Sequence, residues 1–359
     1  MFGLFASKGP FKVRLSGADQ EFTVPPGDTV LKAAIANGLK WPNSCRVGSC
    51  GTCRCRLKSG KIKALNDFSY VLTESELDDG FILACQTALR GNVEIDVALD
   101  GADGSRSEVK TVDGTIAGIR ELTHDIREVR VHVPGGFSKY KSGQFAELSV
   151  ASLKLERPRS YSFASAPERE SDGLLTFHVR HVPKGQMTTW IHSGATIGDP
   201  VAVTGPHGHF YLRDTPAPIV CIAGGSGMAP IKALLEGLAD SGFKRDAVYL
   251  YGARTQRDLY CLEEMKLIED ASGGRFRFIP ILSSEPDESN WPGYRGFVTD
   301  FIAREKTANV NSEAYLCGPP PMIDAAIAQL KLLGVNDRNI FFDKFLDASH
   351  LQAASKAAA

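Results

Sequence analysis

The chain has 359 residues, of which 43% are hydrophobic and 23% are charged. This length suggests two or three domains at the usual ~100–200 residues each, and the composition excludes a disordered, collagenous or coiled-coil chain. A formal net charge of -1 lacks the surplus of basic residues that neutralises phosphates, so we expect no nucleic-acid partner.

No stretch approaches the ~18–20 consecutive apolar residues that a membrane span needs, and residues Met1–Lys8 lack the charged and apolar regions of a secretory signal. We therefore expect a cytoplasmic protein without a membrane span. In a reducing compartment, the eight cysteines are expected to be free thiols or metal ligands. Five of them lie in the first quarter of the chain, namely Cys45, Cys50, Cys53, Cys55 and Cys85.

The first quarter of the chain predicts a small module with both strands and a helix. Alternating residues over 12–24 indicate a β-hairpin, Gly27 and Asp28 are expected to cap a helix over 29–37, and strands are expected at 53–58 and 93–98. Residues 101–108 have the composition of a linker. We place the first domain at residues 1–103.

Two different patterns divide the rest of the chain. Alternating segments predict strands at 114–122, 126–133, 144–150, 160–164, 174–182 and 200–204, which favours an antiparallel β-barrel domain over residues 104–215. Apolar strands at 219–223, 247–251, 277–282 and 314–317 then alternate with helices, which favours a parallel sheet over residues 216–347. Residues 348–359 are expected to form a flexible tail.

Three cysteines share one short loop with the spacing Cys45-x4-Cys50-x2-Cys53. Gly48 and Gly51 let backbone amides approach the sulfur atoms. The spacing is that of plant-type ferredoxins, in which a fourth cysteine completes a 2Fe-2S site, and elimination leaves Cys85 for that position. Zinc ribbons favour paired Cys-x2-Cys knuckles, so a zinc site or buried free thiols are the less favoured alternatives. We expect Cys55 to be a core thiol.

The segment 45–53, Cys-Arg-Val-Gly-Ser-Cys-Gly-Thr-Cys, with Leu-Ala-Cys-Gln at 83–86, resembles the N-terminal ferredoxin module of bacterial oxygenase reductases. The resemblance implies a plant-type ferredoxin β-grasp fold. It also implies that Cys45, Cys50, Cys53 and Cys85 bind the iron atoms of a 2Fe-2S cluster.

A 2Fe-2S cluster carries one electron and nicotinamide gives two as a hydride, so a chain that joins them needs a carrier such as a flavin. The middle domain resembles the flavin-binding signature of the ferredoxin-NADP reductase superfamily. The matching segments are Arg159, Ser160, Tyr161 and Ser162, followed by Gly185 and Thr188. The strand with Phe177, His178 and Val179 leads into the second segment, Met187 lies within it, and we expect these four residues to bind the cofactor as well. The resemblance implies that Arg159 pairs with FAD phosphates, that Tyr161 lies against the flavin and that Ser162 hydrogen-bonds near N5. The helix that starts near Gly185 would hold the pyrophosphate on its amides.

A glycine-rich turn, Gly224, Gly225, Ser226 and Gly227, follows the strand at 219–223 and precedes a helix. In the reductase superfamily this turn contacts NAD(P)H. Arg254 and Asp258 follow the next strand, at the edge where open parallel sheets bind ligands. A carboxylate suits a ribose diol and clustered cations suit a 2'-phosphate, so Asp258 favours NADH, while Arg254 keeps NADPH open. A solvated helix start is the alternative for the arginine.

The last predicted strand ends at Cys317, and a turn with Gly318 and Pro319 follows it. In the superfamily that this motif resembles, it lies where nicotinamide meets flavin, which implies that Cys317 orients hydride transfer without forming a covalent bond. A buried thiol is the alternative. The segment 342–345 resembles the terminal acidic-x-aromatic element of the superfamily, which implies that Phe345 covers the flavin; a core phenylalanine is the alternative. Cys317, Ser162 and Phe345 are thus the expected catalytic residues.

With all three signatures in one order, the chain resembles the three-module oxygenase reductases. The resemblance implies an NAD(P)H:acceptor oxidoreductase that passes electrons from NADH to FAD, to a 2Fe-2S cluster and on to an oxygenase (hydroxylase) component or an intermediate ferredoxin, in aromatic hydrocarbon catabolism. Docking on a membrane-bound hydroxylase stays open. So do two other functions, a reductase for a deoxysugar dehydratase and a redox-sensing regulatory protein.

Overall fold

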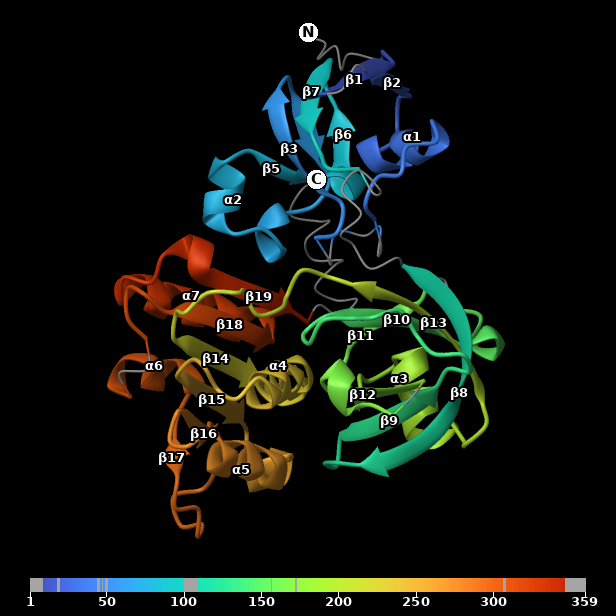
Figure 1. Cartoon of the computed structure of the whole chain (residues 1–359). Coiled ribbons are helices and arrows are strands. Elements are labelled where there is room, and N and C mark those ends of the chain that lie inside the picture. The colour runs from blue at the N-terminus through green and yellow to red at the C-terminus, as the bar shows by residue number, and fades with distance from the viewer. Residues whose placement is uncertain are drawn as a thin grey trace, which may run out of the picture. The chain divides into compact units, whose positions relative to one another are not determined.

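The computed structural model describes residues 9–17, 20–43, 46, 48, 51–99, 109–155, 157–171, 173–305 and 308–345. Two of the predicted iron ligands, Cys45 and Cys50, lie outside the described residues, as do the predicted linker at 101–108 and the predicted tail at 348–359. The described residues up to Leu99 form one compact unit, and those from Val109 to Phe345 form a second one (Figure 1).

The N-terminal unit is a mixed five-stranded sheet with the strand order β2-β1-β7-β3-β5. Its elements are β1 (Phe11–Leu15), β2 (Glu21–Val24), α1 (Val30–Ala36), β3 (Arg54–Ser59), α2 (Glu74–Asp78), β5 (Phe81–Leu83) and β7 (Val93–Asp96), with β4 (Ile62–Ala64) and β6 (Thr87–Leu89) as a separate pair. Helix α1 buries Val30, Leu31 and two alanines in the same hydrophobic cluster as the sheet. The Thr29 side chain caps α1 by accepting from the Lys32 amide, so the cap lies after the predicted Gly27 and Asp28.

The first half of the second unit is a six-stranded antiparallel sheet with the order β11-β10-β13-β8-β9-β12. Its elements are β8 (Lys110–Glu121), β9 (Ile126–His132), β10 (Phe145–Ser149), β11 (Arg159–Ser162), β12 (Leu174–Arg180), α3 (Gln186–Ser193) and β13 (Pro200–His207). A bridge between Phe163 and Phe177 joins the two edge strands, so the sheet curls into a near-barrel around one apolar core.

The second half of this unit is a parallel six-stranded sheet with the order β17-β16-β15-β14-β18-β19. Its strands are β14 (Ile219–Gly224), β15 (Ala247–Ala253), β16 (Phe276–Leu282), β17 (Tyr294–Arg295), β18 (Glu313–Gly318) and β19 (Ile340–Lys344), and its helices are α4 (Met228–Asp240), α5 (Leu262–Ala271), α6 (Phe301–Arg304) and α7 (Pro320–Leu332). Alternate strand residues pack against α4 and α5 on one face and against α6 and α7 on the other.

These three architectures confirm the fold class predicted from the sequence. The edge strands β17 and β19 were not predicted, because β17 has only two residues and the apolar run of β19 covers only three. Within the described part of the chain, no helix is long and apolar enough to cross a bilayer.

Candidate functional site

The glycine-rich turn lies between two strands of the parallel sheet. Strand β14 ends at Gly224, a 3-10 turn covers Gly225–Gly227, and α4 follows at once. Gly225 has a φ of +55°, and a Cβ at Gly227 would collide with the carbonyl oxygen of Cys317 on β18. Glycine is therefore required here, because the turn packs backbone to backbone against the end of β18.

Two tyrosines hold this turn from the core side. The hydroxyls of Tyr251 and Tyr260 each donate to the carbonyl oxygen of Gly225 at 3.2 Å, and the amide of Met228 donates to the same oxygen. Both tyrosines are buried. In a planar trans peptide the carbonyl and the following N–H point in opposite directions, so anchoring this oxygen toward the tyrosines turns the Ser226 amide away from them.

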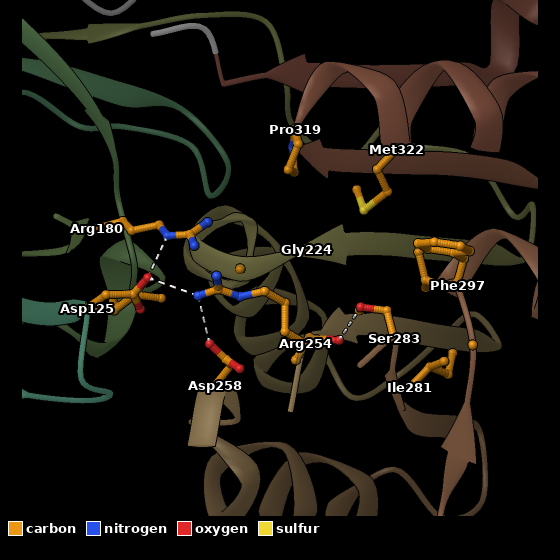
Figure 2. A pocket seen from close by; sticks show the side chains of 16 residues that line it. Asp125, Arg180, Gly224, Arg254, Asp258, Ile281, Ser283, Phe297, Pro319 and Met322 are labelled. Carbon is orange, nitrogen blue, oxygen red and sulfur yellow. Dashed lines mark hydrogen bonds and ion pairs between the residues drawn. The ribbon is translucent and has the colours of Figure 1, made fainter. Parts of the chain in front are cut away.

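A pocket of about 240 Å³ opens beside the turn, at the carboxyl ends of the parallel strands (Figure 2). The sheet contributes Gly224 and Gly225 after β14, Arg254 and Asp258 after β15, and Ser283 after β16. The near-barrel contributes its own wall with Asp125, Ile126 and Arg180. The remaining lining includes Phe297, Val298, Pro319 and Met322. The position matches the edge at which open α/β sheets bind nucleotides.

The charged residues that line this pocket, among those described, are two arginines and two aspartates bound to one another. Arg180 Nε lies 2.9 Å from Asp125 Oδ2, and Arg254 Nη2 lies 3.1 Å from Asp258 Oδ1 and 3.6 Å from Asp125 Oδ2. Asp258 also accepts from the amide and hydroxyl of Thr255. Burial alone would raise the pKa of Asp125, but the charge of Arg180 and the hydrogen bonds from Arg180 and Thr123 together outweigh it and leave that pKa below its ordinary value.

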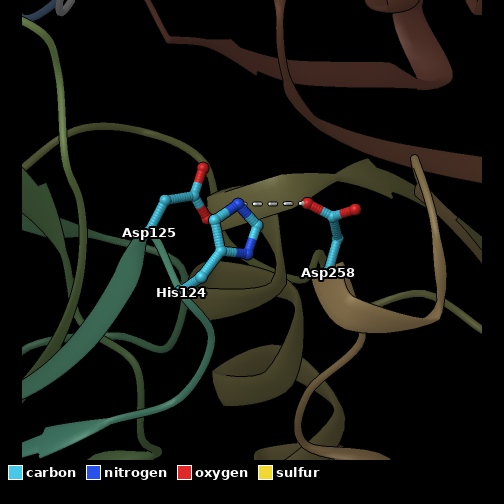
Figure 3. A group of neighbouring side chains, drawn as sticks. All are labelled: His124, Asp125 and Asp258. Carbon is cyan, nitrogen blue, oxygen red and sulfur yellow. Dashed lines mark ion pairs between the residues drawn. The ribbon is translucent and has the colours of Figure 1, made fainter.

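His124 lies at the edge of the same cluster (Figure 3). Its Nε2 is 3.9 Å from Asp258 Oδ1, and His124, Asp125 and Asp258 offer ligand atoms close enough together to surround a cation. Both carboxylates, however, are already bound by the arginines described above. The group is an ion-pair cluster that joins the near-barrel to the parallel sheet, and we assign no metal to it.

Cys317 is the penultimate residue of β18 and is completely buried. Burial, followed by the nearby Asp343 carboxylate, raises the pKa of its thiol well above the ordinary range, so the thiol stays protonated. The amide of Phe345 donates to the carbonyl oxygen of Gly318 at 2.9 Å, and the Phe345 ring packs on the core cluster that contains Cys317. The structure thus brings the two predicted catalytic residues of this domain to one end of β18.

Asp343 faces Cys317 in the register of β18 and β19, and burial raises its pKa to about 6 from a usual 3.8. The folded protein therefore keeps this proton to a higher pH than the unfolded chain, and stability falls as the pH rises between these two values. We expect Asp343→Asn to remove this penalty and to raise the unfolding temperature at about pH 7.5, with a gain of at most about 3 kcal/mol that shrinks toward about pH 5. Thermal scans against pH test this. Asp270→Asn, at an exposed position, is the control, and an equal gain at both pH values would contradict the assignment.

The predicted flavin segment forms the edge strand β11. Ser162 is buried, Tyr161 is half-buried and Ser160 is exposed. Burial raises the pKa of the Tyr161 hydroxyl. The Arg159 guanidinium donates to the carbonyl oxygen of Arg157 at 2.6 Å, which folds its side chain back along the strand. Tyrosine and serine side chains alternate along β11, as a strand that presents residues to both of its faces requires.

Four other predicted flavin residues are buried. Phe177 and Val179 are completely buried in the barrel core, while His178 on the opposite face lies edge-on to Tyr260 with ring centroids 5.4 Å apart. Burial lowers the pKa of His178 to about 3, so the ring is neutral. Met187 is likewise a core residue.

The turn before α3 is built by Gly185 and Thr188. The Thr188 hydroxyl accepts from the Val182 amide at 3.1 Å and donates to the Val182 carbonyl at 3.2 Å, and a Cβ at Gly185 would lie 2.6 Å from that hydroxyl oxygen. The threonine therefore fastens the turn. The free amides of the first turn of α3 are the groups suited to phosphate.

In the N-terminal unit, Cys53 and Cys85 lie side by side in the core. The Cys85 amide donates to the Cys53 sulfur at 3.4 Å. Such N–H···S bonds accompany sulfur ligands of iron–sulfur clusters, so this pair fits a cluster site. Gly48 has a φ of +80°, and a Cβ there would lie 2.7 Å from the Gln86 side chain. The Cys55 thiol instead faces the Ile82 carbonyl oxygen in the core.

Three protein families match the chain in sequence order. They are the 2Fe-2S iron-sulfur cluster binding domain over residues 13–90, the oxidoreductase FAD-binding domain over 113–211 and the oxidoreductase NAD-binding domain over 221–327. The xylene/toluene monooxygenase electron transfer component of Pseudomonas putida is 39% identical over 343 residues, which cover 96% of each chain. The chain belongs to the three-module oxygenase reductases. It is an electron-transfer flavoprotein with sites for a 2Fe-2S cluster, FAD and a nicotinamide nucleotide.

Other relatives of this reductase align over nearly the whole chain. The reductase component of propane 2-monooxygenase from Mycolicibacterium goodii is 34% identical, with 93% of this chain and 97% of that one covered. The solved structure of an Amycolatopsis cytochrome P450 reductase is 31% identical with a TM-score of 0.72, covering 94% of this chain and 99% of that one. The resemblance to oxygenase reductases that the motifs indicated is thereby confirmed.

Several residues of the reductase's pocket were not predicted from its sequence. Asp125 and Arg180 come from the near-barrel, and no motif marks them as neighbours of the glycine turn. Tyr251 and Tyr260 have the pattern of core residues. Phe297 is a large aromatic residue that is nevertheless 68% exposed. The apolar stretch before Thr299 contains no sequence motif that indicates a bound ligand.

Proposed function

We propose that this reductase takes a hydride from NADH and delivers single electrons to the oxygenase component, or to an intermediate ferredoxin, of an aromatic hydrocarbon oxygenase. When bound, FAD accepts two electrons and releases them singly, and a 2Fe-2S cluster carries one at a time. The supporting observation is that three families with these groups match one chain in the order cluster, flavin, nicotinamide. We assign the functions to residues 1–103, 104–215 and 216–347.

The FAD site in this proposal combines β11 with the turn before α3. Tyr161 and Ser162 would contact the flavin ring, and Arg159 would leave its present carbonyl partner for the phosphates, because a guanidinium binds phosphate as a charged fork. Gly185 and Thr188 would act through the turn that they build. Phe177, His178, Val179 and Met187 would support the site from the core and the backbone.

The nicotinamide site in this proposal lies at the glycine turn. Gly224–Gly227 would present backbone amides, and the segment Cys317–Pro319 would border the reacting ring. The neutral, buried Cys317 thiol excludes a role as a nucleophilic thiolate. It would orient the nicotinamide toward Ser162 and the flavin, with Phe345 packed beside it.

Charge at the pocket supports NADH over NADPH. Arg180 and Arg254 are each already paired with an aspartate, so a 2'-phosphate would have to displace carboxylates from both arginines. Thr255 and Arg254 already donate hydrogen bonds to the Asp258 oxygens. Asp258 would therefore favour NADH by neutralising Arg254 more than by accepting a hydrogen bond from a ribose hydroxyl. Steady-state assays with both nucleotides test this, and a higher kcat/KM for NADPH would overturn it.

The electron acceptor in this proposal is inferred from the relatives of the chain. Relatives over nearly the whole chain serve xylene/toluene, propane, phenol and naphthalene oxygenases by their names, which favours an oxygenase over a deoxysugar dehydratase. We include a membrane-bound hydroxylase among the docking partners. We also propose a cytoplasmic location, since Cys55, Cys221, Cys261 and Cys317 are buried free thiols, as in a reducing compartment.

An anaerobic NADH titration of the fully loaded protein tests the whole path. We expect bleaching of the flavin absorbance together with a reduced 2Fe-2S signal by electron paramagnetic resonance, and rapid NADH-driven reduction of cytochrome c. A loaded protein that binds NADH without turnover would instead indicate a redox sensor. Bleaching without any cluster signal would contradict the path from flavin to cluster.

The tyrosine pair behind the glycine turn gives a further prediction. We expect Tyr251→Phe together with Tyr260→Phe to raise KM for NADH about fivefold to twentyfold with a small effect on kcat, because two hydrogen bonds of about 1 kcal/mol each no longer fix the turn. Tyr249→Phe is the matched control, because its hydroxyl contacts the Met228 sulfur at 3.6 Å and not the turn. An equal KM effect in the control would contradict the assignment.

A further inference from the structure

Three charged side chains form one stripe on α4. Lys232, Glu236 and Asp240 are spaced by four residues, so they lie on the same face of the helix. This face meets residues 164–169, which follow the flavin strand β11 directly. Since α4 itself follows the glycine turn directly, the stripe connects the two segments to which we assign flavin and nicotinamide.

The inner part of this contact is a buried charged clip, formed by Lys232 and Glu236. Lys232 Nζ donates to the carbonyl oxygen of Ala164 at 3.0 Å and to Glu236 Oε1 at 2.6 Å. Glu236 Oε2 accepts from the Ala166 amide at 2.9 Å. The two side chains are only 12% and 6% exposed, so neither charge has water as an adequate substitute partner.

The outer part of the stripe adds a second pair. Arg169 donates to Asp240 through Nε at 3.0 Å and through Nη2 at 2.7 Å, the forked geometry that guanidinium and carboxylate prefer. Arg169 Nη1 also lies 3.7 Å from Glu236 Oε1. These side chains are more than one-third exposed, so this pair contributes less than the clip.

Contacts of Tyr140 also hold the segment between the clip and the flavin strand in place. The Tyr140 hydroxyl donates to the carbonyl oxygen of Ser165 at 3.1 Å, and the Tyr140 ring stacks on Phe163 with centroids 3.8 Å apart. Phe163 is the residue after Ser162. A shift of Ala164 or Ala166 relative to α4 would therefore be transmitted to Ser162, because packed and hydrogen-bonded groups between them do not absorb it.

We propose that Lys232 and Glu236 are positioning residues for hydride transfer, which hold the glycine turn in line with the flavin strand. Neither side chain would touch the reacting atoms. Their effect rests on the functions proposed above for the two segments. Hydride transfer requires donor and acceptor to be aligned closely, and a displacement of about 1 Å costs up to about 100-fold in rate.

The test is Lys232→Met in the full chain loaded with FAD and the cluster, studied by anaerobic stopped flow. We expect the limiting rate of flavin reduction at saturating NADH to fall about tenfold or more, while the dissociation constant of NADH changes by less than about twofold. Lys266→Met, at an exposed pair with Asp270 on α5, should change neither value. A wild-type limiting rate in Lys232→Met would overturn the proposal.

A double variant separates positioning from stability. Lys232→Met with Glu236→Leu replaces the buried pair by apolar side chains, which generally restores stability, but it lacks the hydrogen bonds to Ala164 and Ala166. We expect its unfolding temperature to recover and its limiting rate to stay low. Recovery of both would show that the clip acts only through stability. If Lys232→Met does not fold, the same comparison of rate and NADH affinity is made with Glu236→Gln, which keeps the side-chain shape.

This outcome is distinguishable from a failure of the proposed function. If the proposed function fails and the chain does not transfer a hydride from NADH to flavin, the wild-type protein itself will show no rapid flavin reduction by NADH. If only the present inference fails, the wild type will be fast and the variants will be equally fast.

Discussion

Cys85→Ser is expected to abolish the 2Fe-2S signal and the reduction of cytochrome c to background, while NADH still bleaches the flavin. Cys85 is buried, and its amide donates to the sulfur of Cys53 at 3.4 Å, which places the two thiols at one site. Iron in such clusters is bound by cysteine thiolates, and a serine cannot supply the sulfur. The flavin is reduced in the other compact unit, so its reaction with NADH does not depend on this ligand.

Cys55→Ser is the matched control for this prediction. Cys55 lies two residues from Cys53 and is just as buried, but its thiol faces the carbonyl oxygen of Ile82. A serine hydroxyl can donate to the same oxygen, so the variant should keep the cluster. Visible absorbance and electron paramagnetic resonance of the two purified variants provide the comparison. A cluster retained in Cys85→Ser and lost in Cys55→Ser would show that the fourth ligand is assigned to the wrong residue.

Arg245→Met is expected to produce the largest loss of stability, about 3–5 kcal/mol. Arg245 Nη2 lies 2.6 Å from Glu313 Oε2, and the two side chains are 8% and 5% exposed. The arginine also donates to the carbonyl oxygens of Ala217 and Arg213, in the segment between the near-barrel and the parallel sheet. Removing it leaves a buried carboxylate without its cation, because Thr215 and Tyr315 donate only neutral hydrogen bonds to Glu313.

Arg275→Met tests whether burial is the cause. Arg275 and Asp246 directly precede β16 and β15 and pair at 3.3 Å, but the side chains are 55% and 73% exposed. A surface pair of this kind contributes about 0–1 kcal/mol. Unfolding of the loaded protein, followed by flavin fluorescence, should shift strongly for Arg245→Met and barely for Arg275→Met. Equal shifts would mean that the buried pair is not more stabilising than the exposed one.

The sequence by itself determined the features that depend on near neighbours in the chain. Cysteines spaced by four and two residues must share one loop, and Gly224–Gly227 between an apolar strand and a helix can only form a tight turn. The alternation of apolar residues over 126–133 and the apolar run over 219–223 likewise indicated an antiparallel and a parallel sheet. These patterns predicted the fold class, because each of them is a local constraint on the backbone. The resemblance of the motifs to known families then predicted the order of the three electron carriers.

Only the tertiary structure decided which distant residues meet. Asp125 and Arg180 reach the pocket from the near-barrel. Lys232 and Glu236 have the sequence pattern of an ordinary helix surface, but folding buries them against residues 164–169. Phe177 lies on the strand that leads into the flavin signature, and only the structure shows that its side chain fills the barrel core. The physical reason is that burial and ion pairing depend on the groups brought opposite a residue by folding, and the spacing of residues along the chain does not encode those groups.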